Sequence, residues 1–189
     1  MNANFLNNID ASWTLFLDRD GVINTRKFGG YITSPDEFEF NPKVLESIAY
    51  FTQTFNKIII VTNQQGVGKG LMTEEALKTV HSFMISEIEK KSGKIDSIYY
   101  CTDLADSDNN CRKPSPVMAQ KAIADNPEID INKSIMVGDS LSDIEFGKNA
   151  GMKTVFITSS GDGIIASELA DYVCDGLFDF RNSLEKQIK

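Results

Sequence analysis

Acidic, amide and basic residues follow four apolar runs of this 189-residue sequence, at the places where the runs end. The residues are Asp18 and Asp20 after the first run, Thr62 and Asn63 after the second, Arg112 and Lys113 after the loop that follows the third, and Asp139 and Asp143 after the fourth. Carboxylates suit a hard cation, while lysine, hydroxyl and amide groups suit the oxygens of a phosphoryl group. Together these residue types indicate phosphoryl chemistry.

The carboxylates favour a bound Mg²⁺ ion. Asp18, Asp20 and Asp139 in one crevice would repel one another at neutral pH, and a divalent cation relieves that repulsion most directly. Mg²⁺ takes one or two protein carboxylates together with water and substrate phosphate oxygens. Lys113 would add a point positive charge beside it, so that the charge on a transferring phosphoryl group is neutralised.

The spacing of the first two aspartates suits nucleophilic catalysis. A carboxylate such as Asp18 can attack phosphorus and form an aspartyl-phosphate that water then cleaves. Asp20 lies two residues further on, so in extended backbone it points the same way and can protonate the leaving oxygen and later activate the water. Gly21 allows the chain to turn sharply directly after this pair.

Short β-type runs alternate with helical patterns along the chain. The predicted strands span residues 14–18, 57–63, 97–101, 134–139 and 153–158, with a weaker one at 171–174. The predicted helices span residues 42–55, 73–91, 115–126 and 142–150, and a closing helix begins at residue 177. We expect Pro42 in the first turn of its helix and Thr73 as an N-cap. The alternation predicts an α/β fold with a parallel sheet flanked by helices on both faces.

The carboxyl ends of parallel strands meet at one edge of a sheet, so the polar residues are expected to converge there. The gap from Asp20 to Thr62 holds one loop and one helix, and the gap from Asn63 to Lys113 holds one helix, one strand and one loop. Neither gap has room for a large cap domain. The site is therefore expected to be open, with specificity set by loops 24–40, 64–72 and 102–112.

Composition limits the class of protein. Hydrophobic residues make up 41% of the chain and charged residues 24%, as in ordinary globular proteins, and the length predicts a single domain over residues 1–189. The net charge of −8 argues against nucleic acid as a partner, and no apolar run is long enough for a membrane span. The N-terminus lacks the basic and apolar regions of a secretory signal, so we expect a cytoplasmic monomer.

The segments DRDGVIN (18–24), VTNQQG (61–66), CRKPSP (111–116) and GDSLSD (138–143), in this order, resemble the four motifs of the haloacid dehalogenase (HAD) superfamily of phosphatases. More narrowly, they resemble the D-glycero-D-manno-heptose 1,7-bisphosphate 7-phosphatases and the related histidinol-phosphatases. The match runs from about Leu15 to the C-terminal helix. It implies a Rossmann-like fold without a large cap domain.

The resemblance also implies a role for each matched residue. Asp18 would be the nucleophile and Asp20 the general acid/base. The transferring phosphate would be held by Thr62, Asn63 and Lys113. The Mg²⁺ ion would be bound by the side chains of Asp18 and Asp139 and the backbone carbonyl of Asp20, with Asp143 supporting, and Arg112 would contact the remainder of the substrate.

The predicted activity is therefore Mg²⁺-dependent removal of the 7-phosphate of D-glycero-D-manno-heptose 1,7-bisphosphate through an aspartyl-phosphate. The substrate is then a small phosphorylated sugar used in the synthesis of surface-polysaccharide precursors. Histidinol phosphate is the nearest alternative, because histidinol-phosphatases share the same motifs. An open site also admits a nucleic-acid 3′-phosphatase, and a non-catalytic phosphate-binding protein on the same scaffold is a further alternative.

Two of the three cysteines, Cys101 and Cys111, bracket the loop before Arg112. Similar proteins hold this loop with zinc bound by three cysteines and a histidine, but Asp103 and Asn109 stand here in place of two ligands. Structural zinc sites are nearly always four-coordinate, so we expect no zinc. A disulfide between the two cysteines is disfavoured in a reducing cytoplasm.

Two further residues are assigned structural positions. His81, the only histidine, lies in the middle of a predicted helix without Cys or carboxylate at ligand spacing. We therefore expect His81 to be a residue of the helix surface or a packed residue, and not a catalytic one. Cys174 is expected to be a small buried apolar residue on a late strand.

Overall fold

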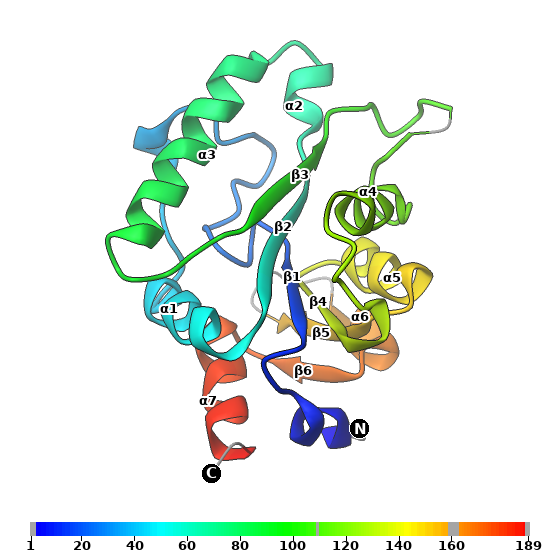
Figure 1. Cartoon of the computed structure of the whole chain (residues 1–189). Helices are drawn as coiled ribbons and strands as arrows, with labels where there is room; N and C mark the ends of the chain where they lie inside the picture. Colours follow the sequence, from blue (N-terminus) through cyan, green and yellow to red (C-terminus); the bar gives the residue numbers. More distant parts are fainter. Residues whose placement is uncertain (1–2, 109, 159–162, 188–189) are drawn as a thin grey trace.

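The computed structural model describes residues 3–108, 110–158 and 163–187, and its centre is a six-stranded sheet in which every neighbouring pair of strands is parallel. The strand order is β3-β2-β1-β4-β5-β6 (Figure 1). The strands are β1 (Thr14–Leu17), β2 (Lys57–Asn63), β3 (Ser97–Cys101), β4 (Ser134–Gly138), β5 (Lys153–Ile157) and β6 (Tyr172–Cys174). All six predicted strands and the predicted α/β class are thereby confirmed.

Helices cover both faces of the sheet, as predicted (Figure 1). The helices are α1 (Val44–Thr54), α2 (Gln65–Gly68), α3 (Glu74–Glu89), α4 (Val117–Asp125), α5 (Leu141–Ala150), α6 (Gly163–Leu169) and α7 (Leu177–Gln187), with short 3₁₀ turns η1 (Ala3–Asn8), η2 (Pro35–Glu37) and η3 (Ile131–Lys133). Helices α1, α3 and α7 pack on one face, and α4, α5 and α6 pack on the other.

Strand β1 shows why consecutive apolar residues are needed in the centre of such a sheet. Leu15 and Leu17 point into the cluster that includes α1, α3 and α7, whereas Phe16 points into the cluster that includes α4 and α5. All three side chains are fully buried. A strand covered on both faces has no solvent-facing side, so polar alternation is absent from it.

Two helix starts test the capping predictions. The Thr73 side chain accepts a hydrogen bond from the backbone N–H of Ala76 at 3.1 Å, which confirms the N-cap of α3. The prediction for Pro42 was wrong, because Lys43 adopts a left-handed conformation with φ of 57° and α1 begins only at Val44. A residue in that region cannot continue a right-handed helix, so Pro42 lies outside it.

The connections between the motifs are short, as expected. The chain between β1 and β2 carries η2 and α1, and the chain between β2 and β3 carries α2 and α3. A large cap domain is therefore absent from these two fully described connections. The segment between β2 and α3, within the expected loop 64–72, contains the single-turn helix α2. Among the described residues, none of the helices has the length and apolar character needed to cross a membrane.

Candidate active site

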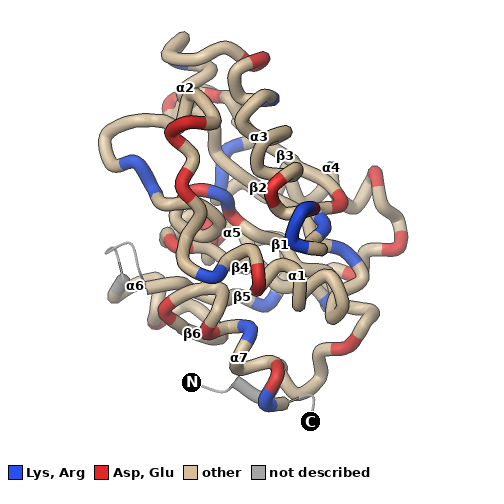
Figure 2. The backbone as a smooth tube through the Cα atoms, turned by 90° about the vertical axis from the view of Figure 1, so that its left-hand side faces the viewer, with Lys and Arg blue, Asp and Glu red and all other residues tan. Residues whose placement is uncertain are grey.

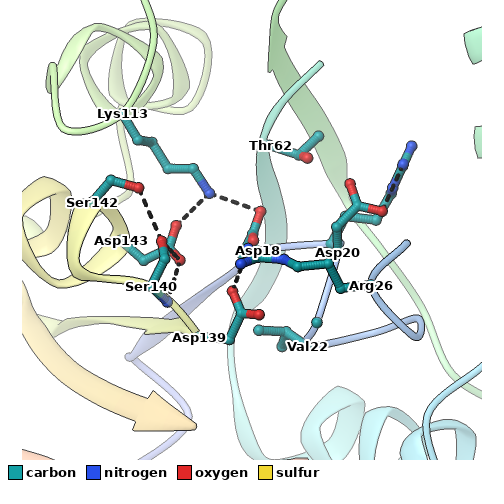
Figure 3. Close-up of polar contacts among 12 residues, drawn as sticks. Asp18, Asp20, Val22, Arg26, Thr62, Lys113, Asp139, Ser140, Ser142 and Asp143 are labelled. Carbon is teal, nitrogen blue, oxygen red and sulfur yellow. Dashed lines mark hydrogen bonds and ion pairs between the residues drawn. The ribbon is translucent and has the colours of Figure 1, made fainter. Parts of the chain in front are cut away.

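A cavity of about 310 Å³ lies outside the carboxyl ends of the central strands. It is lined by residues from every predicted motif, including Asp18, Asp20, Thr62, Asn63, Arg112, Lys113 and Asp143. Asp139 follows β4 directly, and its carboxylate lies close to those of Asp18 and Asp143, which line the cavity (Figure 3). The structure thus brings together all the predicted site residues, as the convergence of parallel strand ends requires.

Lys113 connects two aspartates at the bottom of the cavity (Figure 3). Its Nζ donates to Asp18 Oδ1 at 2.7 Å and to the carbonyl of Val61 at 2.9 Å, and it pairs with Asp143 Oδ1 at 2.5 Å. Burial alone would lower the pKa of Lys113, but the carboxylates of Asp143 and Asp18 outweigh burial and raise it. Lys113 therefore remains a cation in a buried position. The Asn63 side chain also accepts from the backbone N–H of Lys113 at 2.9 Å.

Asp18 is buried at the end of β1, with 4% of its surface exposed. Its backbone N–H donates to the carbonyl of Val137 at 3.0 Å, which continues the pairing with β4 by one residue. Burial raises the pKa of the Asp18 carboxyl to about 6, although Lys113 acts in the opposite direction and Asp143 adds to the increase. A carboxylate that is poorly solvated and still largely ionised at pH 7 is suited to nucleophilic attack.

Asp20 is held by three side-chain donors. Arg19 donates to Asp20 Oδ1 at 2.8 Å and Asn24 donates to the same oxygen at 3.0 Å, while Gln64 donates to Oδ2 at 2.9 Å. Burial would raise the pKa of Asp20, but the charge and hydrogen bond of Arg19 and the bonds from Asn24 and Gln64 together lower it. The side chain is therefore an ionised base with a fixed orientation.

Arg19 is almost completely buried, and its partner on the far side is His81. The Nη1 of Arg19 lies 3.2 Å from His81 Nε2, so the histidine accepts from the arginine. Burial and the charge of Arg19 lower the pKa of His81 to about 3, which keeps the ring neutral. The packing alternative for His81 is therefore confirmed, and the surface alternative is wrong because only 5% of the residue is exposed.

Three carboxylates form a group that suits a divalent cation. Asp18, Asp139 and Asp143 are all buried, and each can place a carboxylate oxygen within 4.8 Å of the others. A Cβ atom at Gly21 would collide with the Asp139 carboxylate, so only glycine permits the close approach of this turn to Asp139. The oxygen donors of this group are the ligands that Mg²⁺ prefers. The residues therefore fit the predicted metal.

Asp143 also has a structural task at the start of α5. Its Oδ2 accepts from the backbone N–H of Ser140 at 3.0 Å and from the Ser140 hydroxyl at 2.6 Å, as part of a capping box. The side chain is thus oriented by its own helix, while its other oxygen meets Lys113. We name Asp18, Asp20, Lys113, Asp139 and Asp143 the floor of the site.

The entrance of the cavity is formed by loops. We name its lining residues Arg26, Lys27, Phe28, Tyr31 and Arg112 the rim. Phe28 is 76% exposed, and the rim contributes three cations although the chain as a whole has a net charge of −8. Acidic and basic positions are otherwise interspersed along the backbone (Figure 2). The rim therefore suits an anionic ligand.

Several of these functional contacts were missed at the sequence level. Arg26 was not singled out, yet its Nη2 donates to Asp139 Oδ1 at 2.7 Å. Gln64 lies next to a recognised motif position and binds both Asp20 and the Thr62 hydroxyl. Arg19 and Asn24 stand inside the DRDGVIN segment itself. Their position within that motif was the available signal, because a buried polar side chain must find partners nearby.

The expectation that the two cysteines before Arg112 form no disulfide was wrong. Cys101 at the end of β3 and Cys111 form a disulfide, with their Cα atoms 5.6 Å apart. The expectation relied on the redox state of a cytoplasm, whereas the fold places the two residues within bonding range. The backbone N–H of Cys111 also donates to the Asp103 carboxylate at 2.9 Å. In this oxidised form the sulfurs are not thiolate ligands, and Asn109 lies outside the described residues.

The comparisons with known proteins agree with this geometry. Residues 110–179 match the family model described as HAD-hydrolase-like. A D-glycero-D-manno-heptose-1,7-bisphosphate 7-phosphatase of Chlorobaculum tepidum is 31% identical over 185 residues, which cover 90% of this chain and 92% of that protein. The D-glycero-beta-D-manno-heptose-1,7-bisphosphate 7-phosphatase of Escherichia coli K12 is 33% identical, with 93% of this chain and 95% of that protein covered.

The Escherichia coli relative is named for the beta anomer of the heptose, and another relative is named for the alpha anomer. The D-glycero-alpha-D-manno-heptose-1,7-bisphosphate 7-phosphatase of Campylobacter jejuni is 38% identical over 145 residues, covering 77% of this chain and 81% of that protein. Among solved structures, the D,D-heptose 1,7-bisphosphate phosphatase of B. bronchiseptica, complexed with magnesium and phosphate, superimposes with a TM-score of 0.83 at 29% identity. That match covers 93% of this chain and 99% of the other.

The parallel sheet, the carboxylates at its edge and these matches define the chain as a member of the haloacid dehalogenase-like hydrolases. The identities above 30% over most of both chains narrow the assignment further. The chain belongs to the family of the D-glycero-D-manno-heptose 1,7-bisphosphate 7-phosphatases.

Proposed function

We propose that this protein hydrolyses the 7-phosphate of D-glycero-D-manno-heptose 1,7-bisphosphate with the help of Mg²⁺, as a monomer in the cytoplasm. The observation that carries the proposal is the buried contact between Asp18 and Lys113 beside the oriented carboxylate of Asp20. Binding alone would not need a nucleophile, a cation and a base in this arrangement, so a non-catalytic role is disfavoured.

In the first step, Asp18 attacks the phosphorus atom and forms an acyl phosphate, while the bond from phosphorus to the sugar oxygen breaks. Lys113 and the polar groups of Thr62 and Asn63 line the cavity where they can bind the phosphoryl oxygens. Asp20 donates a proton to the leaving sugar oxygen. Because its three donors favour the ionised form, Asp20 takes this proton from solvent when the anionic substrate binds, since the negative charge of the phosphate favours the protonated carboxyl.

In the second step, Asp20 accepts a proton from water as the water attacks phosphorus. The bond between phosphorus and the Asp18 oxygen breaks, which releases inorganic phosphate and restores the Asp18 carboxylate. The fixed orientation given by Arg19, Asn24 and Gln64 suits this base role.

Mg²⁺ is assigned because the carboxylate oxygens of the site are the ligands that it prefers. Asp18 and Asp139 would hold Mg²⁺ together with the backbone carbonyl of Asp20, and Asp143 would support them. A bound Mg²⁺ ion supplies positive charge that neutralises the phosphoryl oxygens during transfer. The related B. bronchiseptica enzyme, which was solved with magnesium and phosphate, supports this choice of metal.

The rim supports a bisphosphate over histidinol phosphate. Arg26, Lys27 and Arg112 line the entrance of the cavity and suit a second phosphate group. Histidinol carries a cationic amine, which the same three cations would repel. A nucleic-acid 3′-phosphatase would need contacts along a strand of phosphates, and a net charge of −8 disfavours them.

Measuring phosphate release tests the proposal directly. The purified protein with Mg²⁺ is given the alpha and beta anomers of the heptose 1,7-bisphosphate, histidinol phosphate and a 3′-phosphorylated oligonucleotide. We expect kcat/KM to be highest on one heptose bisphosphate, with loss of turnover after chelation of the metal. A higher kcat/KM on histidinol phosphate or on the oligonucleotide would overturn the assignment.

A further inference from the structure

Arg26 is the residue that joins the rim to the floor. Its Nη2 donates to Asp139 Oδ1 at 2.7 Å; the Asp139 side chain is completely buried, whereas that of Arg26 is 30% exposed. Figure 3 shows the arginine extending past Asp18 to reach Asp139. The rim cation Arg26 thus contacts one of the three carboxylates that suit a divalent cation.

The two carboxylate oxygens of Asp139 have different surroundings. Oδ2 is turned towards Gly21, because a Cβ atom built there would collide with that oxygen first. Oδ1 is the oxygen bound by Arg26. Lys113 forms ion pairs with both Asp18 and Asp143 on the other side of the floor. Arg26 therefore compensates Asp139 from the rim side of this group, and Lys113 pairs with Asp18 and Asp143.

We propose that Arg26 is an internal counter-cation that leaves Asp139 when a divalent cation binds and then binds the second anionic group of the substrate. A guanidinium and a divalent cation on one carboxylate repel each other at short range in a buried site. Once released, Arg26 remains in the wall of the cavity with Arg112. Arginine is well suited to bind a phosphate through two parallel hydrogen bonds. The substrate half of this inference rests on the proposed function.

The neighbouring Lys27 provides a matched control. It lines the same cavity and carries the same charge, but its Nζ pairs with Glu37 Oε1 at 2.6 Å. The two residues are adjacent in the same exposed loop, which includes Gly29 with a φ of 71°. A charge change at either position alters the overall field similarly, while only Arg26 contacts the floor.

Titration of the protein with MgCl₂ in a calorimeter, without substrate, tests the counter-cation. We expect Arg26→Gln to lower the Kd for Mg²⁺ about tenfold, as is typical of coupling between two binding events. Lys27→Gln should change it less than about twofold because that charge is further away and screened. Arg26→Lys keeps a cation in place and should stay close to the unmodified protein. An unchanged Kd in Arg26→Gln, or equal tightening in both glutamine variants, would overturn the counter-cation.

Steady-state kinetics at saturating Mg²⁺ test the substrate half. We expect Arg26→Gln to raise KM for the heptose bisphosphate about tenfold with little change in kcat, because uniform binding is lost. An unchanged KM would overturn the anion-binding role. The Mg²⁺ titration contains no substrate. The two tests can therefore fail separately. If the protein does not hydrolyse the heptose bisphosphate, the proposed function is refuted. If Arg26→Gln still shifts the Kd for Mg²⁺ in that case, the counter-cation role of Arg26 is retained.

Discussion

The floor and the rim of the site are built in different ways. Three of the floor residues, Asp18, Asp20 and Asp139, follow the ends of buried strands, Asp143 lies in the first turn of α5, and Lys113 lies in the loop before α4. Asp18, Asp139, Asp143 and Lys113 are each at most 4% exposed, while the Asp20 side chain is 24% exposed. Rim residues lie on loops, and their side chains are exposed or half-buried. The contrast indicates that the sheet fixes the atoms that need accurate positions, while the loops carry the contacts that distinguish one substrate from another.

Relatives illustrate the same division. Proteins with 31–38% identity act on heptose bisphosphates that differ in anomer, according to the names of the Campylobacter jejuni and Escherichia coli enzymes. A change of anomer alters the position of the phosphate that is not transferred, and leaves the transferred one unaffected. The floor can thus be shared while the rim changes. The following predictions test this division, from the largest expected effect to the smallest.

Asp18→Asn should remove the floor's nucleophile and lower kcat by at least about a thousandfold. The amide is of similar size, and Lys113 keeps its contact with Asp143, so the fold should survive. Phosphate release and circular dichroism measure the two effects. Asp36→Asn, at an exposed position of η2, is the matched control and should keep full activity. Turnover of Asp18→Asn near the unmodified rate would refute the aspartyl-phosphate mechanism.

Lys113→Met should destabilise the floor itself. The substitution leaves the buried carboxylates of Asp18 and Asp143 without their shared cation, at a cost of about 3–5 kcal/mol in the free energy of unfolding. Urea denaturation without Mg²⁺ gives the loss. The exposed Lys69 offers a control through Lys69→Met, which should change stability by less than about 0.5 kcal/mol. Equal stability of both variants would show that the ion pairs of Lys113 with Asp18 and Asp143 do not stabilise the fold.

Cys111→Ser should remove the disulfide that closes the loop before the rim residue Arg112. The disulfide to Cys101 closes a short loop before Arg112, and its removal should lower the free energy of unfolding by about 2–3 kcal/mol. A thiol reductant should reproduce this loss in the unmodified protein and have no effect on the variant. Cys174→Ser is the matched control, since that buried cysteine is free and should leave the response to reductant unchanged. A reductant effect that persists in Cys111→Ser would contradict the assignment.

The buried His81, which contacts Arg19, should make the stability of the protein depend on pH. Its pKa is lowered to about 3 in the folded protein, below its ordinary value of 6.5, so the unfolded chain binds a proton that the folded chain excludes. Stability should therefore fall as pH drops from 6.5 towards 3, by up to about 1.4 kcal/mol per pH unit from this group. His81→Gln lacks the proton site, and denaturation at several pH values should show a shallower decline. Identical slopes would contradict the buried neutral histidine.

Much of the fold and the floor could be predicted from the sequence. Consecutive apolar residues in strands such as 57–63 reveal burial on both faces, and parallel topology then brings the residues after each strand together. The prediction for Pro42 failed because the left-handed conformation of Lys43 is not encoded in helical periodicity. The lysine side chain lies 4.0 Å from the centre of the Phe178 ring, a contact between distant segments.

The rim and the supporting contacts were less predictable. The pairs Arg26–Asp139 and Arg19–His81 join residues 113 and 62 positions apart, so local patterns do not show which residues pair with one another. The disulfide likewise depends on where β3 ends relative to the loop that returns to Arg112. Loop conformation decides each case, and loops follow tertiary contacts more than local propensity.

The division between floor and rim is tested most directly by Arg112→Ala on two substrates. The measurement is kcat/KM for the heptose 1,7-bisphosphate and for p-nitrophenyl phosphate, which has one phosphate and no sugar. We predict a loss of about 10- to 100-fold on the bisphosphate and less than about threefold on the simple ester, because a rim cation contacts only the second phosphate. An equal loss on both substrates would place Arg112 in the chemistry and contradict the division.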